Sequence, residues 1–179
     1  MVLMISALLV SGSVAAAPDT APRPPSQAIA IVGATVIPMD SERVLPNRTV
    51  LLENGRIIAV GPADSVAVPR GATVIDARGR YLVPGLADMH IHLTPEMGTR
   101  PDFGDAPLYL ANGVTTVLNL YGDSLHLAWR ARIRDGSLLG PTLYTAGEFV
   151  NEPRVNTPEE AEQEVRGQAA AGFDVIKFR

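Results

Sequence analysis

Two of the chain's three histidines lie two positions apart, in His90-Ile91-His92. They belong to an apolar run, 86–93, with the length and composition of a buried strand, and alternate residues of a strand share one face. The two imidazoles should therefore point the same way, with Cα atoms roughly 6.5–7 Å apart. A divalent metal between them would be within reach of both rings; the alternative is two hydrogen-bonded polar side chains at a strand end.

A lysine in apolar surroundings is the second candidate. Lys177 lies in Asp174-Val175-Ile176-Lys177-Phe178, which predicts a strand buried on both sides. Because a buried ammonium is unfavourable, this lysine must pair with a carboxylate, extend its amine from the strand end, or stay neutral and act chemically. The residues alone leave these three roles open.

Other polar residues near predicted strand ends carry weaker signals. Asp88 is expected on the same strand face as His90, making either a structural hydrogen bond or a contact to a metal. His126 falls near the start of a predicted helix and is expected to be exposed. The residues that could line a substrate pocket are Asn119, Tyr121, Glu148 and Asn151.

The composition excludes several classes of protein and site. Fifteen Lys and Arg against nineteen Asp and Glu give a net charge of −4, without a long basic run, so nucleic acid is not expected as a partner. The absence of cysteine excludes disulfides, thiolate zinc sites and a cysteine nucleophile from these residues. With 46% hydrophobic residues, the chain can form a packed core.

The first 27 residues predict a targeting segment and a linker. Residues 1–17 carry no charged side chain and run from an apolar block to small residues, which indicates a signal peptide cleaved near Ala16 or Ala17 and a periplasmic or secreted protein. The apolar block is too short for a stable membrane span. Residues 18–27 contain four prolines and predict an extended linker.

The pattern of predicted secondary structure changes near residue 84. Residues 28–83 alternate short β-rich runs with turn signals, including a hairpin signal at Asn54-Gly55, and predict a small antiparallel sheet or sandwich. The strands are expected at 29–32, 35–37, 49–52, 56–60 and 73–75.

Residues 84–179 predict about four βα units, with strands at 86–93, 114–120, 142–150 and 174–178. One helix is expected over 124–135, with Leu125, Trp129 and Ile133 on one face and Gly136 at its end, and a shorter one should end at Asn112-Gly113. The last helix should begin at Thr157-Pro158, present Ala161, Val165 and Ala169 as a stripe, and end at Gly172. Four such strands are half of a (β/α)₈ barrel or most of a small doubly wound sheet.

The segment Val83-Pro84-Gly85-Leu86-Ala87-Asp88-Met89-His90-Ile91-His92-Leu93 resembles the first barrel strand of the amidohydrolase superfamily, metal-dependent hydrolases with a (β/α)₈ barrel. The resemblance extends over 28–178. Segments 53–61 and 74–80 are similar to the family's N-terminal β-sandwich, 112–117 and 140–147 to its second and third barrel strands, and 171–177 to the fourth strand of its imidazolonepropionase-like and prolidase-like branch.

The resemblance implies a site and a reaction. His90 and His92 would be ligands of the more buried of two divalent metals, expected to be Zn²⁺, and a carboxylated Lys177 would bridge them. A neutral amine adds CO₂ to give a carbamate, whose anionic oxygens two cations stabilise. The implied enzyme hydrolyses amide, peptide-like or cyclic amide carbon–nitrogen bonds through a metal-activated hydroxide. Its partners would be small molecules or short peptides: dipeptides, N-acyl amino acids, cyclic amides such as imidazolones and, as weaker candidates, lactones or deaminated heterocycles. A homo-oligomer is possible.

The resemblance also sets the expected organisation. Residues 28–83 would be an N-terminal β-sandwich segment and 84–179 the first half of a TIM-like barrel. The family pattern continues with histidines on the fifth and sixth strands and a proton-shuttling Asp on the eighth, so the catalytic residue is expected beyond Arg179.

Two hypotheses follow from that expectation. Either the 179 residues are a fragment of an exported amidohydrolase, or they form an inert half-barrel that depends on a partner. Reading the DNA past the codon for Arg179 distinguishes them: a continuing frame with these His and Asp residues supports the fragment, and a stop codon there contradicts it.

Overall fold

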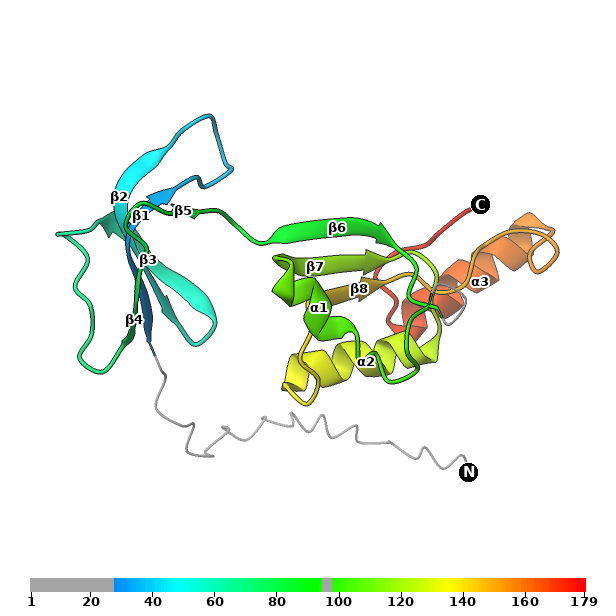
Figure 1. The fold of residues 1–179 in the computed structure, drawn as a ribbon. Helices are drawn as coiled ribbons and strands as arrows, with labels where there is room; N and C mark the ends of the chain where they lie inside the picture. Colours follow the sequence, from blue (N-terminus) through cyan, green and yellow to red (C-terminus); the bar gives the residue numbers. More distant parts are fainter. Residues whose placement is uncertain (1–27, 95–97) are drawn as a thin grey trace, which may run out of the picture. The chain divides into compact units, whose positions relative to one another are not determined.

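The computed structural model describes residues 28–94 and 98–179, which divide into two compact units (Figure 1). One unit comprises 28–37 and 43–82, and the other comprises 38–42 and 83–179. The predicted signal peptide and linker lie outside the described residues. None of the helices in the described part is long and apolar enough to cross a membrane.

The first unit is one five-stranded sheet. Its strands are β1 (Ile29–Val36), β2 (Leu45–Glu53), β3 (Arg56–Pro62), β4 (Thr73–Asp76) and β5 (Tyr81–Leu82). The order is β3-β2-β1-β4, and β5 also pairs with β1. The pairs β1–β2 and β2–β3 are antiparallel, but β4 and β5 run parallel to β1, so the expectation of an antiparallel sheet is wrong for these two strands. The connection 63–72 takes the chain to the other edge of β1, which is what makes the parallel pairing possible.

Glycine has two different effects in this sheet. At Asn54-Gly55 both residues have positive φ, 53° and 71°, and Glu53 pairs with Arg56, so the predicted hairpin is confirmed. At Gly33, with φ 79°, β1 does not end as predicted but continues through a register shift between Ile31 and Ala34. A Cβ at Gly33 would lie 2.5 Å from the Arg78 Cγ, which explains why glycine is needed at this bulge.

The sheet of the first unit is apolar on both faces. One face carries a cluster built from Ala34, Val36, Val50 and Ala77, and the other carries Ala28, Ala30 and Leu51. Neighbouring residues such as Val50 and Leu51 belong to different clusters because successive side chains of a strand alternate. The described residues therefore form one sheet with an apolar cluster on each face and exposed edge strands, and a two-sheet sandwich is not seen among them.

The second unit contains a parallel sheet with strand order β6-β7-β8. The strands are β6 (Leu86–Ile91), β7 (Val114–Asn119) and β8 (Thr142–Thr145), and the helices are α1 (Ala106–Ala111), α2 (Ser124–Asp135) and α3 (Pro158–Ala171). The predicted fourth strand is present as two isolated parallel bridges, Ala146 with Val175 and Val150 with Phe178. Phe178 is 63% exposed, so the prediction of a strand buried on both sides is wrong: no described strand covers its outer edge.

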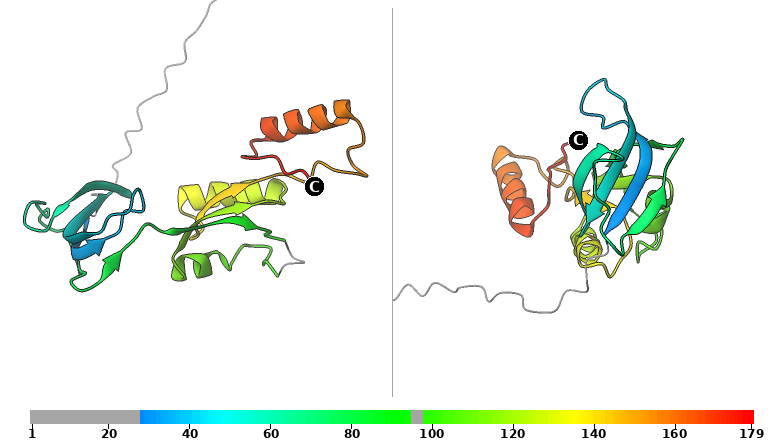
Figure 2. Two further views of the ribbon diagram at one scale, coloured as in Figure 1. Left: turned by 90° about the horizontal axis from the view of Figure 1, so that it is seen from above. Right: turned by 90° about the vertical axis from the view of Figure 1, so that its left-hand side faces the viewer.

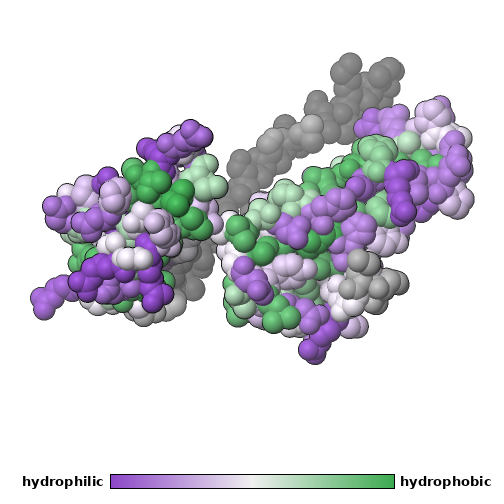
Figure 3. All heavy atoms as spheres, turned by 45° about the horizontal axis from the view of Figure 1, so that its top comes forward, coloured by the Kyte–Doolittle hydropathy of each residue, from purple (hydrophilic) through white to green (hydrophobic). Residues whose placement is uncertain are grey.

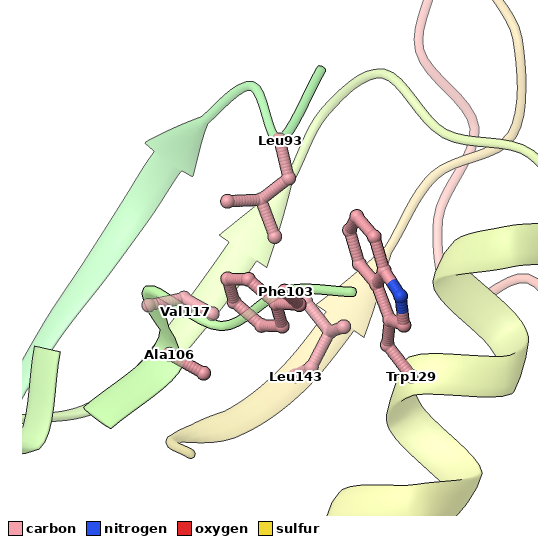
Figure 4. Packing of buried hydrophobic residues seen from close by; sticks show 6 residues of the cluster. All are labelled: Leu93, Phe103, Ala106, Val117, Trp129 and Leu143. Carbon is pink, nitrogen blue, oxygen red and sulfur yellow. The ribbon is translucent and has the colours of Figure 1, made fainter. Parts of the chain in front are cut away.

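One apolar core holds α1 and α2 against the same face of this sheet (Figure 4). Phe103 and Ala106 lie at α1, Trp129 projects from α2, and both sets meet Val117 of β7 and Leu143 of β8. The alternate residue Tyr144 points to the opposite face and is 44% exposed. A doubly wound sheet carries helices on both faces, so this one-sided arrangement disfavours that alternative. Apolar residues also reach the surface of both units (Figure 3).

The helix ends follow local signals. The bounds of α2 match the prediction, and Gly136 ends it with φ 81°. Thr157 caps α3 in a capping box with Glu160, and Gly172 ends it with φ 90°, both as predicted. The predicted apolar stripe of α3 is not a buried face, since Ala169 is exposed and Gln168 is the buried residue. Helix α3 lies alongside the C-terminal segment in both views of Figure 2.

Candidate metal centre

The two histidines of the His90-Ile91-His92 motif come together at the carboxyl end of β6. Their ring centroids are 5.6 Å apart, and His92 directly follows the last residue of the strand. Ile91 between them packs against the core under α1 and α2. The imidazoles therefore occupy the face of the sheet that these helices leave open, as strand alternation predicts.

His92 has a nitrogen that needs a partner. Its Nε2 atom is buried and has no hydrogen-bond partner in the part of the chain that the structure describes. Burial lowers the pKa of His92, and the positive charges of His90, Lys177 and Arg179 lower it further. The lowered pKa favours the neutral ring, and neutral imidazole is the form whose nitrogen can bind a metal ion. These properties fit a metal ligand.

Lys177 is brought to the same end of the sheet. Its carbonyl oxygen accepts a hydrogen bond from the Val150 N–H at 2.9 Å, which fixes the segment 174–178 beside the extension of β8. The side chain is half-buried, and its charge acts on His92. Across 28–94 and 98–179, no three side chains of the types His, Cys, Asp and Glu gather into a metal site. Among the described residues, a third donor beside the two histidines would be of another type, and Lys177 is the candidate nearby.

Asp88 does not share the face of the histidines. A register shift between Asp88 and Ile91 breaks the alternation, and the pairing partner of Asp88 is Val117, whose side chain faces the helices. Burial and the charge of Asp88 both raise the pKa of Tyr109 in α1. The Asp88 Oδ1 accepts the His90 N–H at 3.2 Å. Asp88 therefore supports the backbone of His90, and its predicted place beside the imidazoles is wrong.

Two aromatic rings flank His92. Tyr121 and Phe149 lie 6.3 and 6.1 Å from the imidazole and stack on each other at 4.6 Å, and the Arg179 guanidinium lies 5.5 Å from the Phe149 centroid. These rings form an apolar wall beside the His92 side chain. Tyr121 was among the predicted pocket residues. Phe149 was missed because it lies in the predicted strand 142–150, where an aromatic residue is an ordinary apolar residue, whereas β8 ends at Thr145.

The predicted pocket residues lie in different surroundings in the structure. Tyr121 and Glu148 line a cavity of about 240 Å³ that also reaches Asp123 and His126. Glu148 forms an ion pair with Arg154 at 3.2 Å. Asn119 is completely buried and is not a pocket residue.

His126, expected to be exposed, is 4% exposed. It occupies the third position of α2, where its Nδ1 completes a capping box with Asp123. A histidine three residues after an N-cap aspartate was the signal that could have revealed this.

No family model matches the chain. An adenine deaminase of Chelativorans sp. (strain BNC1) is 45% identical over 91 residues, which are 50% of this chain and 14% of that protein. The crystal structure of a Bifidobacterium longum protein assigned provisionally as a prolidase has a TM-score of 0.74 and 28% identity, covering 85% of this chain and 40% of that one. Phenylurea hydrolase B has a TM-score of 0.73 and 28% identity, covering 85% and 45%. These similarities support the resemblance to the amidohydrolase superfamily.

The chain spans less than half the length of the solved structures named above and a still smaller share of the adenine deaminase. The matched portion nevertheless includes both units of the fold, since 85% of the chain is covered. The similarity to these proteins and the geometry at the end of β6 thus bear on the same part of the chain.

Proposed function

We propose that the chain belongs to a metal-dependent hydrolase acting on carbon–nitrogen bonds. The observation that carries this proposal is the buried, unpartnered Nε2 of His92 beside the ring of His90, at the carboxyl edge of a parallel sheet. The names of the similar proteins, an adenine deaminase and phenylurea hydrolase B, support a substrate with a carbon–nitrogen bond to be cleaved.

The fold supports a larger architecture of the same kind. A parallel sheet in sequential order, with α1 and α2 on one face, fits the first strands of a (β/α)₈ barrel whose active site lies at the carboxyl ends of its strands. In this proposal residues 84–179 supply the first four βα units and 28–83 an N-terminal β-sandwich segment. Residues 1–17 act as the export signal, cleaved near Ala16 or Ala17.

His90 and His92 are the proposed ligands of one metal, and Lys177 is the proposed bridge to a second, with Zn²⁺ expected at both. When bound, such ions supply a hydroxide nucleophile near neutral pH and polarise the bond to be cleaved. Lys177 can serve as an oxygen donor only after its neutral amine has bonded to the carbon of CO₂ and released one proton, giving a carbamate.

The chain's own residues prepare this site. The low pKa of His92 keeps its ring unprotonated, so a metal need not displace a proton from it near neutral pH. Tyr121 and Phe149 cover one side of the imidazole and limit the access of water from that side. Substrates are expected to be small molecules or short peptides that bind at the carboxyl ends of the strands.

The test is metal analysis of the full-length protein, wild type against Lys177→Ala, with Arg179→Ala as the matched control. Arg179 also places a positive charge near His92 but is not a proposed ligand. We expect two equivalents of Zn²⁺ in wild type and in Arg179→Ala, and the loss of at least one equivalent in Lys177→Ala. Hydrolysis of a panel of adenine, Xaa-Pro dipeptides and phenylureas should fall by at least about 100-fold in Lys177→Ala.

Two outcomes contradict the proposal. Equal metal content and activity in wild type and Lys177→Ala would exclude the bridging role of Lys177. Unchanged metal content in His92→Ala would exclude the proposed metal centre at His90 and His92.

A further inference from the structure

A line of hydrogen bonds, buried at its centre, crosses the carboxyl ends of the parallel strands. At its centre, the Asn119 Oδ1 accepts the Leu93 N–H at 2.9 Å, and the Asn119 Nδ2 donates to the Thr145 Oγ1 at 3.1 Å and to the Tyr121 carbonyl oxygen at 2.7 Å. Asn119 and Thr145 are both fully buried. Leu93 directly follows His92, so this asparagine holds the backbone next to a proposed metal ligand.

The same line continues to the segment that carries Lys177. The Thr145 N–H donates to the Asp174 Oδ2 at 2.9 Å, and the Asp174 N–H donates to the Thr145 carbonyl oxygen at 2.9 Å. Arg130 of α2 donates to the same Asp174 oxygen at 2.5 Å. We name Asn119, Thr145 and Asp174 the strand-end belt. It links the residue after His92 to a residue three positions before Lys177.

A second side chain holds Leu93 from the other direction. The His126 Nε2 lies 2.7 Å from the Leu93 carbonyl oxygen, and because a carbonyl only accepts, this nitrogen donates. The His126 Nδ1 in turn accepts the Asp123 N–H at 3.0 Å. Both backbone polar groups of Leu93 are therefore held by side chains, one from the end of β7 and one from α2.

Asn119 has no polar group left for a substrate, because its oxygen and both of its amide hydrogens are used inside the fold. An apolar residue would fill the same space beside Val117 but would leave the Leu93 amide unpaired and free to shift. Metal ligands bind well only when their positions are fixed by the groups behind them.

We propose that Asn119 is a positioning residue. Through Leu93 and Thr145 it fixes the distance between the backbone that carries His90 and His92 and the backbone that carries Lys177, and so sets the metal affinity of the site. This inference rests on the proposed function.

The experiment compares full-length wild type with Asn119→Ala and with Asn112→Ala. Asn112 flanks the other end of β7, and its Nδ2 also donates to a backbone oxygen, that of Leu108, at 2.8 Å. Zn²⁺ affinity is measured by competition with a chromophoric chelator, ligand geometry by the visible absorption of the Co²⁺-substituted protein, and stability by the melting of the metal-free protein. We expect Asn119→Ala to weaken Zn²⁺ binding about 10-fold and to alter the Co²⁺ spectrum, and Asn112→Ala to change neither.

If Asn119→Ala does not fold, two variants of Thr145 test the positioning role of Asn119 instead. Thr145→Val removes the acceptor of the Asn119 amide, whereas Thr145→Ser keeps it. We expect the valine variant to weaken Zn²⁺ binding at least about threefold and the serine variant to restore the wild-type affinity and spectrum.

The outcomes separate the two proposals. Variants that melt earlier but keep Zn²⁺ affinity within about twofold, with an unchanged Co²⁺ spectrum, would show that the belt only stabilises the fold, and this inference would be overturned. A wild-type protein that binds no Zn²⁺, or a His92→Ala variant that binds it normally, would instead overturn the proposed function and this inference with it.

Discussion

The two units of the chain differ in the burial and in the sequence separation of the polar contacts compared below. In the first unit, an apolar cluster lies on each face of the sheet, and the buried Thr49 Oγ1 has no partner among the described residues. Its ion pair between Arg78 and Asp76, at 2.6 Å, is exposed and joins residues two positions apart. In the second unit, Asn119 and His126 are buried and bond to a residue 26 or 33 positions away.

This difference indicates where function is concentrated. An exposed pair between near neighbours contributes little to stability, whereas a buried polar group lowers stability unless a hydrogen-bond partner is correctly placed. In the second unit, Asn119 and His126 are such buried groups, and their hydrogen bonds lie at the strand ends near the histidines and Lys177. The first unit has the properties of a supporting structure.

The largest expected effect is on the core under the parallel sheet. Trp129 stacks on Phe103 with centroids 4.9 Å apart and is 3% exposed. Trp129→Ala should lower the free energy of unfolding by about 3–5 kcal/mol, measured by urea denaturation followed by circular dichroism. Val50→Ala, at the same depth in the first unit, should cost about 2 kcal/mol. A larger loss from Val50→Ala would mean that the first unit carries the main core.

A smaller effect separates buried from exposed polar groups. His126→Ala leaves the Leu93 carbonyl and the Asp123 N–H without a partner and should cost about 1–3 kcal/mol. Asp76→Ala, which removes the exposed ion pair of the first unit, should lower the melting temperature much less than His126→Ala does. Equal shifts in the two variants would break the distinction between the units.

Local backbone strain should not distinguish the units. Gly55 in the first unit and Gly172 in the second have φ values of 71° and 90°, so replacing either by alanine should cost about 1 kcal/mol. Gly167, inside α3 and with open space around it, is the control: Gly167→Ala should raise stability by about 0.5–1 kcal/mol. Chemical denaturation of the three variants measures these differences, and a loss of stability in Gly167→Ala would contradict the expectation.

The smallest effects are on pH dependence, and they fall in different ranges for the two units. Burial and neighbouring charges lower the pKa of His92 below 6.5, so the unfolded chain takes up this proton first, and the stability of metal-free protein should fall as the pH drops below 6.5. The Arg78 hydrogen bond lowers the pKa of Asp76 from 3.8 to about 2, so its stabilising contribution is present above 3.8 and is lost as the pH falls toward 2.

Unfolding of wild type and His92→Gln between pH 7.5 and 5 measures the first range, and the variant should lose less stability. NMR titration of the Asp76 carboxyl at low and high salt measures the second. A titration of Asp76 near 3.8 at low salt would contradict the ion pair seen in the structure.

Features that depend on a few neighbouring residues could be predicted from the sequence. The ends of α2, the cap at Thr157, the glycines at 136 and 172 and the Asn54-Gly55 hairpin all appear where expected. In each case the hydrogen bond or the positive φ that makes the feature lies within about four residues of the signal. The pairing of His90 with His92 belongs to the same class, because strand alternation is local.

Features that depend on which strands meet could not be predicted in this way. The parallel pairing of β4 and β5 with β1, the continuation of β1 through Gly33 and the shift that separates Asp88 from the histidines are all matters of register between distant segments. A single inserted residue reverses the faces of a strand, and nothing in the local sequence around Asp88 marks that insertion.

The sequence by itself thus determined that two imidazoles share a face at a strand end and that an isolated lysine follows in a later apolar run. Only the tertiary structure decided that the His92 Nε2 is buried without a partner, that Lys177 comes near it, and that Asn119 and His126 are internal. Burial and charge are properties of what surrounds a side chain, and those surroundings exist only once β6, β7, β8 and the segment 174–178 lie side by side.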